Sequence, residues 1–261
     1  MPELRLPEPG NWARTGKVAL PLKVVLAVAF CYVVVRGLVA VYEGSYLTAV
    51  LWWATLGTPF LLVAAYLAVA VGGARQRVSS DSSGLTFRPD KRLSVGYFVV
   101  MAMLIPAAPL FAVLLSRGEL DLSTTRGIQI AVSVAFWALA LLAVVALAAG
   151  IRRGGTGYLK FTPTRIEIAD VLKTRVVQWN DVVDVRDVAS TTTANQGGKA
   201  VVLCLREGTE EVVSGLPLYV PKGVALYWLV RHYWKHPEHR DELVDSRAPR
   251  RLTEGKFDLS A

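Results

Sequence analysis

Four long apolar stretches dominate the hydrophobic pattern of the chain. They cover Val18–Val41, Tyr46–Gly72, Ser94–Ser116 and Arg126–Ile151, and each holds 23 to 27 residues. A helix needs about 20 apolar residues to cross the ~30 Å hydrocarbon core of a bilayer. Apart from Arg126 at an edge, only Lys23 and Arg36 are charged within them, and none has the polar face of a buried soluble helix. The pattern therefore predicts a domain of four transmembrane helices over residues 18–151.

Composition supports a membrane protein with a modest water-soluble part. Mean hydropathy is +0.39 and charged residues make up 19% of the chain, against about 25% in an average soluble protein. The first apolar stretch is longer than the apolar region of a signal peptide, which runs to about 15 residues before a small-residue cleavage site. Because Val41-Tyr42-Glu43 follows it, we expect a retained anchor.

Basic residues beside the four stretches predict their orientation in a cell membrane. Most lie in the N-terminal segment 1–17, in the connection 73–93 and just after the fourth stretch (Arg5, Arg14, Lys17, Arg75, Arg77, Arg88, Lys91, Arg92, Arg152 and Arg153). The other two connections hold only Arg117, with Arg126 at the next helix edge. Since cytoplasmic loops are enriched in Lys and Arg, both termini and the 73–93 loop are predicted to be cytoplasmic, with the lipid bilayer as the first partner.

The net charge of +8 and a pI near 9.6 could suggest nucleic-acid binding. We expect no nucleic-acid partner, because the membrane topology accounts for much of the excess. The two cysteines, Cys31 and Cys204, lie far apart in segments of different character, which excludes a disulfide framework and a Cys-rich zinc site. Cys204 has no histidine near it in sequence that could activate it as a nucleophile.

From Gly154 the pattern changes to short β-type segments. Six candidate strands cover 158–162, 165–168, 173–179, 182–188, 200–205 and 210–214, separated by turn signals. Pro221 is then expected to open an amphipathic helix over Lys222–His236, which Pro237 breaks or kinks. The polar tail 245–261 is expected to be disordered.

Three short motifs in this region carry a family resemblance. They are Gly157–Pro163, Val177–Val182 with Trp179 followed by Asn180-Asp181, and Tyr233–Glu238 at the end of the helix. Together they resemble the pleckstrin-homology-like (PH-like) domains of bacterial, especially actinobacterial, multi-pass membrane proteins. The resemblance implies an α+β PH-like domain over 154–244, an antiparallel β-barrel closed by a C-terminal helix. That barrel has seven strands, so one remains unplaced. The resemblance does not supply phosphoinositide binding, for which Lys173 and Arg175 are too few.

Three histidines deserve scrutiny as metal ligands. His232, His236 and His239 have the i, i+4, i+7 spacing of one helix face, and His-x3-His on a helix can bind Zn or Ni. Pro237 interrupts the helix before His239, and Tyr233 stands where the metalloprotease motif has glutamate. We therefore expect ordinary helix-end histidines, with no metal and no cofactor.

Arg36 is the candidate functional residue of the membrane domain. An intramembrane charge is a functional hypothesis by default, although arginine can also reach the interface along its aliphatic chain. Its candidate partners are Glu43, Glu119 and Asp121. The second and third stretches are interrupted by Pro59 and by the pair Pro106 and Pro109, as in the broken helices of transporters.

Leu85 and Phe87 in the 73–93 loop are candidate domain-docking residues. They alternate with polar residues as a half-buried strand does, and a lone strand in water is unstable. Pairing with an edge of the PH-like sheet would bury both and could supply the missing strand; the rival is a disordered or membrane-interfacial loop. Residues 84–91 also resemble 158–165, since both read Leu-x-Phe-x-Pro-x-basic, either through duplication or by chance.

These features favour a non-catalytic function, because no nucleophile–base or carboxylate pair emerges. The leading hypothesis is a scaffold or accessory subunit of a membrane or envelope protein complex, with other membrane proteins as partners. The alternative is a small transporter or transporter subunit that uses Arg36 and the proline-broken stretches.

Overall fold

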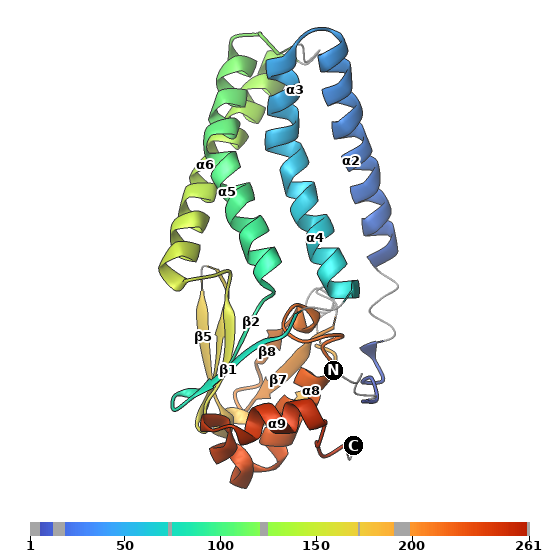
Figure 1. The fold of residues 1–261 in the computed structure, drawn as a ribbon. Helices are drawn as coiled ribbons and strands as arrows, with labels where there is room; N and C mark the ends of the chain where they lie inside the picture. The colour runs from blue at the N-terminus through green and yellow to red at the C-terminus, as the bar shows by residue number, and fades with distance from the viewer. Residues whose placement is uncertain are drawn as a thin grey trace. The chain divides into compact units, whose positions relative to one another are not determined.

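The computed structural model describes residues 6–12, 19–72, 75–120, 125–171, 173–190 and 199–259. The chain divides into two compact units (Figure 1). The helical unit consists of Pro21–Ala65 and Arg92–Gly155. The β unit draws on three separate parts of the chain: Met1–Leu20, Tyr66–Lys91 and Thr156–Ala261.

All four apolar stretches form helices. The first is α2 (Ala19–Tyr42); the second is α3 (Tyr46–Trp52), the π-helical segment η1 (Trp53–Gly57) and α4 (Thr58–Gly72); the third is α5 (Lys91–Ser116) and the fourth is α6 (Arg126–Arg153). By length and composition, four helical segments of the described chain could cross a membrane.

Aromatic and small residues pack the helical unit. Trp52 of α3 meets Phe111 of α5 with ring centroids 5.9 Å apart, and Phe111 meets Phe136 of α6 at 4.4 Å. On α2, Gly37 leaves room for the indole of Trp53, because a Cβ on this glycine would lie 2.1 Å from Nε1 of Trp53. Such close approach at small residues is typical of helices that associate in lipid, where packing replaces the hydrophobic effect.

The prolines act differently in the two stretches that contain them. Pro59 lacks an N–H and its ring crowds the carbonyl four residues before it, and the turn that precedes it is the π-helical segment η1. Pro106 and Pro109, which the sequence predicts as interruptions, lie inside α5, and that helix continues from Lys91 to Ser116. The expectation of a broken third stretch is therefore wrong: α5 tolerates both prolines, as membrane helices often do.

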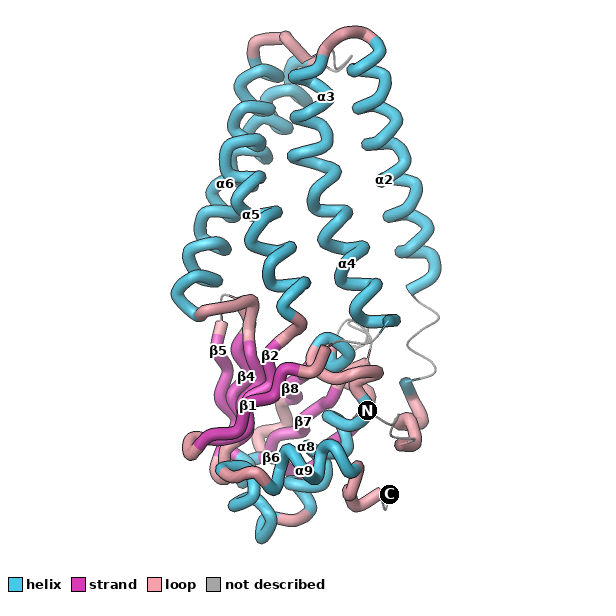
Figure 2. Tube along the Cα trace, viewed as in Figure 1, coloured by secondary structure: helices cyan, strands magenta, loops and turns pink. Residues whose placement is uncertain are grey.

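The β unit holds two antiparallel sheets (Figure 2). The first runs in the order β1-β2-β3-β4-β5 and the second in the order β6-β7-β8. Their bounds are β1 Arg77–Asp81, β2 Gly84–Arg88, β3 Tyr158–Phe161, β4 Arg165–Ala169, β5 Thr174–Gln178, β6 Val182–Arg186, β7 Val201–Leu205 and β8 Glu210–Val213. The six strands expected after Gly154 are thus present, and two more come from the connection between α4 and α5.

The strand β1 is a correction to the sequence prediction. The serine-rich sequence Ser79–Ser83 by itself predicts a solvated loop, yet Arg77–Asp81 pairs with β2 along its whole length. The turn between them is held by Asp81, whose carboxylate accepts a hydrogen bond from the backbone N–H of Ser83 at 2.7 Å. The polar side chains of β1 do not predict a strand, because its stability comes from backbone hydrogen bonds to β2.

The core of the β unit lies between the sheets and helix α8 (Val224–Lys235). Trp179, Tyr233, Phe87 and Phe161 are its largest fully buried side chains. The helix begins at Val224 rather than at Pro221, because Lys222 and Gly223 have φ of 60° and 75° and form a tight left-handed turn.

The N-terminal segment also belongs to this core. Trp12 is 3% exposed, and its Nε1 donates to the carbonyl of Ala200 at 3.1 Å. In return, Nε1 of Trp228 on α8 donates to the carbonyl of Pro7 at 2.9 Å. Residues 6–12 are thus fixed to the same unit as the C-terminal strands.

The segment after Asp245 is ordered, which corrects the prediction of a disordered tail. After the 3₁₀ helix η4 (Pro237–Val244), residues Arg247–Glu254 form α9. Its two apolar side chains, Ala248 and Leu252, lie one turn apart and are buried in the core. The sequence pattern does not predict this helix, because the segment is mostly polar and only two of its side chains pack into the core.

A buried ion pair joins α9 to η4 and α8. Arg251 donates to both carboxylate oxygens of Glu242, at 2.8 and 2.7 Å, and the hydroxyl of Tyr233 donates to Oε2 of the same carboxylate at 3.2 Å. Glu242 is 8% exposed. Removing one member of such a pair leaves an uncompensated buried charge, which is costly even where the pair itself contributes little.

We expect Arg251→Met to destabilise the β unit by about 3 kcal/mol, because the carboxylate of Glu242 loses its bidentate partner. The measurement is the thermal unfolding of the full chain in detergent, followed by near-ultraviolet circular dichroism of the buried tryptophans. Glu254→Gln, which removes the exposed partner of Lys256, is the control and should leave the midpoint unchanged. Equal midpoints for Arg251→Met and wild type would contradict the proposed importance of the pair.

The Glu242–Arg251 pair should make the stability of the β unit depend on pH in the acidic range. Hydrogen bonds from Arg251 lower the pKa of Glu242 below its ordinary value of 4.5. The stabilisation that follows is present above pH 4.5 and is lost as pH falls through the lowered pKa. The difference in unfolding midpoint between wild type and Glu242→Gln should therefore shrink as the pH is lowered below 4.5. A difference that stays constant over this range would contradict the assignment.

Candidate functional site

Leu85 and Phe87 lie in β2, which pairs antiparallel with β3. Leu85 is opposite Phe161 and Phe87 is opposite Leu159, and both Leu85 and Phe87 are fully buried. The rings of Phe87 and Phe161 meet edge to face with centroids 5.7 Å apart. The two side chains are thus part of the core of the β unit, and the connection between α4 and α5 is a structural part of that unit.

The approach of β2 to β3 depends on a glycine. Gly84 has φ of 137°, and a Cβ there would lie 2.4 Å from the carbonyl oxygen of Phe161. A larger residue would force the strands apart or change the turn. Gly84 therefore sets the point at which the β1–β2 hairpin meets the sheet.

Arg36 lies on α2 beside a pocket inside the helical unit. Its guanidinium carbon lies 6.0 Å from the centroid of the Trp52 ring, and no described hydrogen-bond acceptor reaches its buried Nε atom. The pocket holds about 70 Å³ and is lined by Arg36, Val39, Ala40, Glu43, Ser45, Thr48, Trp52, Glu119 and Leu120. A buried guanidinium N–H without a hydrogen-bond acceptor is costly, so this pocket is one place where an acceptor would bind favourably.

Two of the three predicted partners of Arg36 line the same pocket. Glu43 and Glu119 contribute carboxylates to its wall, while Asp121 lies outside the described residues. Among described residues Arg36 forms no ion pair within 4 Å. Ser45 and Thr48 add hydroxyl groups that sequence reasoning missed, since nothing in the pattern places them beside Arg36.

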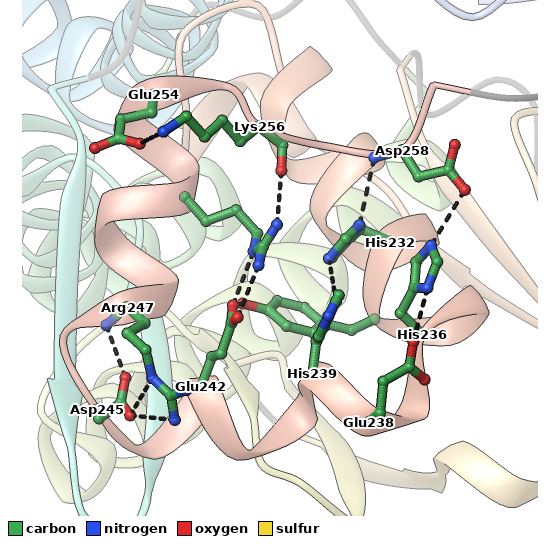
Figure 3. A network of polar contacts seen from close by, with 12 residues as sticks. His232, His236, Glu238, His239, Glu242, Asp245, Arg247, Glu254, Lys256 and Asp258 are labelled. Carbon is green, nitrogen blue, oxygen red and sulfur yellow. Dashed lines mark hydrogen bonds and ion pairs between the residues drawn. The ribbon is translucent and has the colours of Figure 1, made fainter.

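The three histidines of the chain form one cluster (Figure 3). Ring centroids of His232 and His236 are 4.8 Å apart, those of His236 and His239 5.3 Å, and those of His232 and His239 5.2 Å. His232 lies in the last turn of α8, and His236, four residues later, is the C-cap of that helix. His239 follows three residues later in η4, and residues i and i+3 of a 3₁₀ helix are eclipsed. Pro237 ends α8, but it does not remove His239 from the cluster, which corrects the inference drawn from α-helical spacing.

Hydrogen bonds assign the protons of the cluster. Both ring nitrogens of His236 face carboxylates, Nδ1 at 3.0 Å from Glu238 and Nε2 at 3.2 Å from Asp258. These contacts raise the pKa of His236, with the Glu238 hydrogen bond as the largest cause.

The pKa of His232 is shifted in the opposite direction to that of His236. It is 3% exposed, and burial lowers its pKa to about 4. Its Nδ1 accepts from the backbone N–H of Asp258 at 3.3 Å. The neutral ring therefore carries its proton on Nε2 and donates it to Nδ1 of His239, 3.1 Å away.

Within this cluster, three potential metal ligands converge. Ligand atoms of His236, Glu238 and His239 all lie within 4.8 Å of one another. The donor set is two imidazoles and one carboxylate. The histidine spacing alone does not indicate Glu238, which lies in η4 between His236 and His239.

Two further features limit what the β unit can do chemically. Burial raises the pKa of the Cys204 thiol, which opposes formation of a nucleophilic thiolate. A pocket in the core between the sheets and α8 holds about 10 Å³ and is lined only by apolar side chains, so it has room for at most a water molecule.

Comparison with known proteins gives no match: neither a family model, nor a curated protein, nor a solved structure is similar to this chain.

We expect Phe87→Ala to destabilise the β unit by about 3 to 5 kcal/mol, since it removes a fully buried aromatic ring from the core. Thr86→Ala, at the neighbouring position on the opposite face of β2, is the matched control and should change stability far less. Unfolding midpoints of both variants in detergent test this. A Phe87→Ala chain as stable as Thr86→Ala would mean that β2 does not contribute to the core.

Proposed function

We propose that the chain is a multi-pass membrane protein that holds a PH-like interaction domain at the cytoplasmic face of the cell membrane. One observation carries the proposal: the β unit is built from the chain before α2, between α4 and α5, and after α6. Each excursion away from this unit consists of two long apolar helical segments. A folded domain on one side of a bilayer requires an even number of crossings between its segments, and two per excursion meets that requirement.

The dimensions and charges of the helices support insertion. Helix α2, with 24 residues, is about 36 Å long at 1.5 Å per residue, enough for the ~30 Å hydrocarbon core. Basic residues gather where helices join the β unit, as with Lys91 and Arg92 at the start of α5 and Arg152 and Arg153 at the end of α6. This is the distribution of cytoplasmic helix ends.

A PH-like identity for the β unit is supported by two antiparallel sheets followed by a helix that packs into their core. We propose a non-catalytic role for it, as a scaffold or accessory subunit of a membrane or envelope complex. Strand β5 is its most suitable docking edge: among described strands it pairs only with β4, and Val176 at its centre is 51% exposed. A partner strand added there would satisfy its outer backbone groups.

A second candidate function is the binding or transport of a small polar solute. It is favoured by the pocket of about 70 Å³ whose lining includes Arg36, Glu43 and Glu119. The mixture of one cation with two carboxylates suits a zwitterion. Thermal shifts with a panel of amino acids, absent in Arg36→Met and retained in Arg117→Met, would support this function; no shift with any of them would count against it.

The topology predicts opposite accessibility for two positions. In a chain with Cys31→Ala and Cys204→Ala, the variant Glu43→Cys should react with a membrane-impermeant maleimide in intact cells. Ser83→Cys, at the exposed β1–β2 turn, should react only after permeabilisation. Labelling of Ser83→Cys but not Glu43→Cys in intact cells would overturn the orientation.

The interaction role predicts that a partner is lost when β5 is altered. A protein that co-purifies with the full chain should be lost from Val176→Lys, where the added charge obstructs strand addition. Glu207→Lys, at an exposed turn, is the control for an added lysine and should retain the partner. Equal recovery from both variants would exclude β5 as the docking edge.

A further inference from the structure

We propose that His236, Glu238 and His239 form a binding site for one divalent transition-metal ion of the zinc class. The inference is independent of the membrane topology and of the scaffold role, because it rests only on side chains at the α8–η4 junction. Two imidazoles and a carboxylate are the ligands of many three-residue zinc sites, which leave a further position for water. Imidazole nitrogen also favours zinc, nickel or copper over magnesium and calcium, which prefer oxygen ligands.

The distances fit such a site after small side-chain movements. Two ligand atoms at about 2.0 Å from a zinc ion in tetrahedral geometry lie roughly 3.3 Å apart. Nδ1 of His236 and Oε1 of Glu238 are 3.0 Å apart, so a metal between them needs only a slight opening. The three ligand atoms lie within 4.8 Å of one another, so the widest pair must close by about 1.5 Å at most. Glu238 can adjust its position toward a metal, since its side chain is 62% exposed.

The backbone fixes the ligands near one another before any metal arrives. Helix α8 ends at Lys235, His236 is its C-cap, and η4 begins at Pro237. The backbone N–H of His239 donates to the carbonyl of His236 at 3.1 Å, which holds the two residues together. The two imidazole rings are stacked with planes 28° apart, so one ring must turn about its side-chain torsions before both nitrogen lone pairs face one metal. The backbone itself needs little ordering on binding, which favours affinity.

The outer contacts are those of a metal-binding histidine pair. When Nδ1 of His236 binds the metal, Nε2–H continues to donate to the carboxylate of Asp258, 3.2 Å away. A ligand histidine whose other nitrogen meets a carboxylate is the usual arrangement in zinc sites, because it fixes the ring and raises its basicity. Nδ1 of His239 is in contact with His232, which leaves Nε2 of His239 for the metal.

Metal binding by His239 requires a change of tautomer in two rings. With Nε2 of His239 on the metal, its proton lies on Nδ1 and is donated to Nε2 of His232, 3.1 Å away. His232 then holds its own proton on Nδ1 and gives up the long 3.3 Å hydrogen bond from the backbone of Asp258.

The small number of histidines in the chain makes a binding test specific for this cluster. All three histidines lie in this cluster, so imidazole-dependent metal binding by the full chain must occur here if the protein carries no histidine tag. The experiment is equilibrium dialysis of the tag-free full chain in detergent against ZnCl₂, with metal and protein quantified on both sides, and a parallel titration with CoCl₂ followed by visible absorption.

We expect saturable binding of one Zn²⁺ per chain, and a visible Co²⁺ spectrum typical of low-symmetry four- or five-coordination. Glu238→Gln and His239→Gln should each weaken binding at least about tenfold. Glu254→Gln, which removes an exposed carboxylate outside the cluster, should leave it unchanged. Circular dichroism of each variant should match wild type, so that lost binding is not lost folding. Absence of saturable binding, or binding that Glu238→Gln and His239→Gln leave unchanged, would overturn the site.

Discussion

The pairing of β2 with β3 is the contact on which the organisation of this chain depends. Strand β2 lies between α4 and α5, and β3 follows α6, so residues far apart in sequence become neighbours when Leu85 meets Phe161. The pairing closes the α5–α6 segment into a loop with both ends on one sheet. It also lets the segments before α2, between α4 and α5 and after α6 contribute to a single core, as Trp12 does from the N-terminal side. Any membrane arrangement of the helices must respect this closure, because a strand pair cannot form across a bilayer.

The sequence predicts those elements whose stability comes from their own composition. The apolar helices were recognisable because each is a stretch of more than twenty mostly apolar residues. The strands from β3 to β8 were recognisable because their apolar and polar residues alternate or run together between turns. Elements that depend on a partner were missed. Strand β1 has only Val78 as an apolar side chain, and α9 has only Ala248 and Leu252. Their burial is decided by the neighbours that they meet, which local pattern does not contain. The start of α8 was misplaced for a similar reason, since the left-handed turn at Lys222 and Gly223 brings Gly223 so close to Leu216 that a Cβ on the glycine would lie 2.8 Å from the Cβ of Leu216.

The residues of the candidate sites also differ in whether their own sequence or their spatial neighbours identify them. Arg36 was identifiable because a charge in an apolar helix is rare, and Glu43 and Glu119 followed from charge complementarity. The hydroxyls of Ser45 and Thr48 belong to the same pocket only because two helix ends and a connecting turn meet there. For the histidines, counting on an ideal α-helix led to the wrong conclusion at Pro237. A proline stops the i to i−4 hydrogen-bond pattern, but the 3₁₀ helix that follows has its own periodicity of three, and this periodicity restores His239 to the face of His236.

The likeness between residues 84–91 and 158–165 has a physical explanation whatever its origin. In the antiparallel pair, Thr86 lies opposite Lys160, and a local two-fold axis passes between them. That axis places Leu85 opposite Phe161 and Phe87 opposite Leu159, so the two rings lie on a diagonal with centroids 5.7 Å apart. A Leu-x-Phe segment facing a copy of itself in this register alternates large and branched side chains across the buried face, and no ring needs to stack directly on another. Selection for a well-packed core would therefore favour similar sequences on both strands even if they arose separately. The motif is evidence for a two-fold packing solution where β2 pairs with β3.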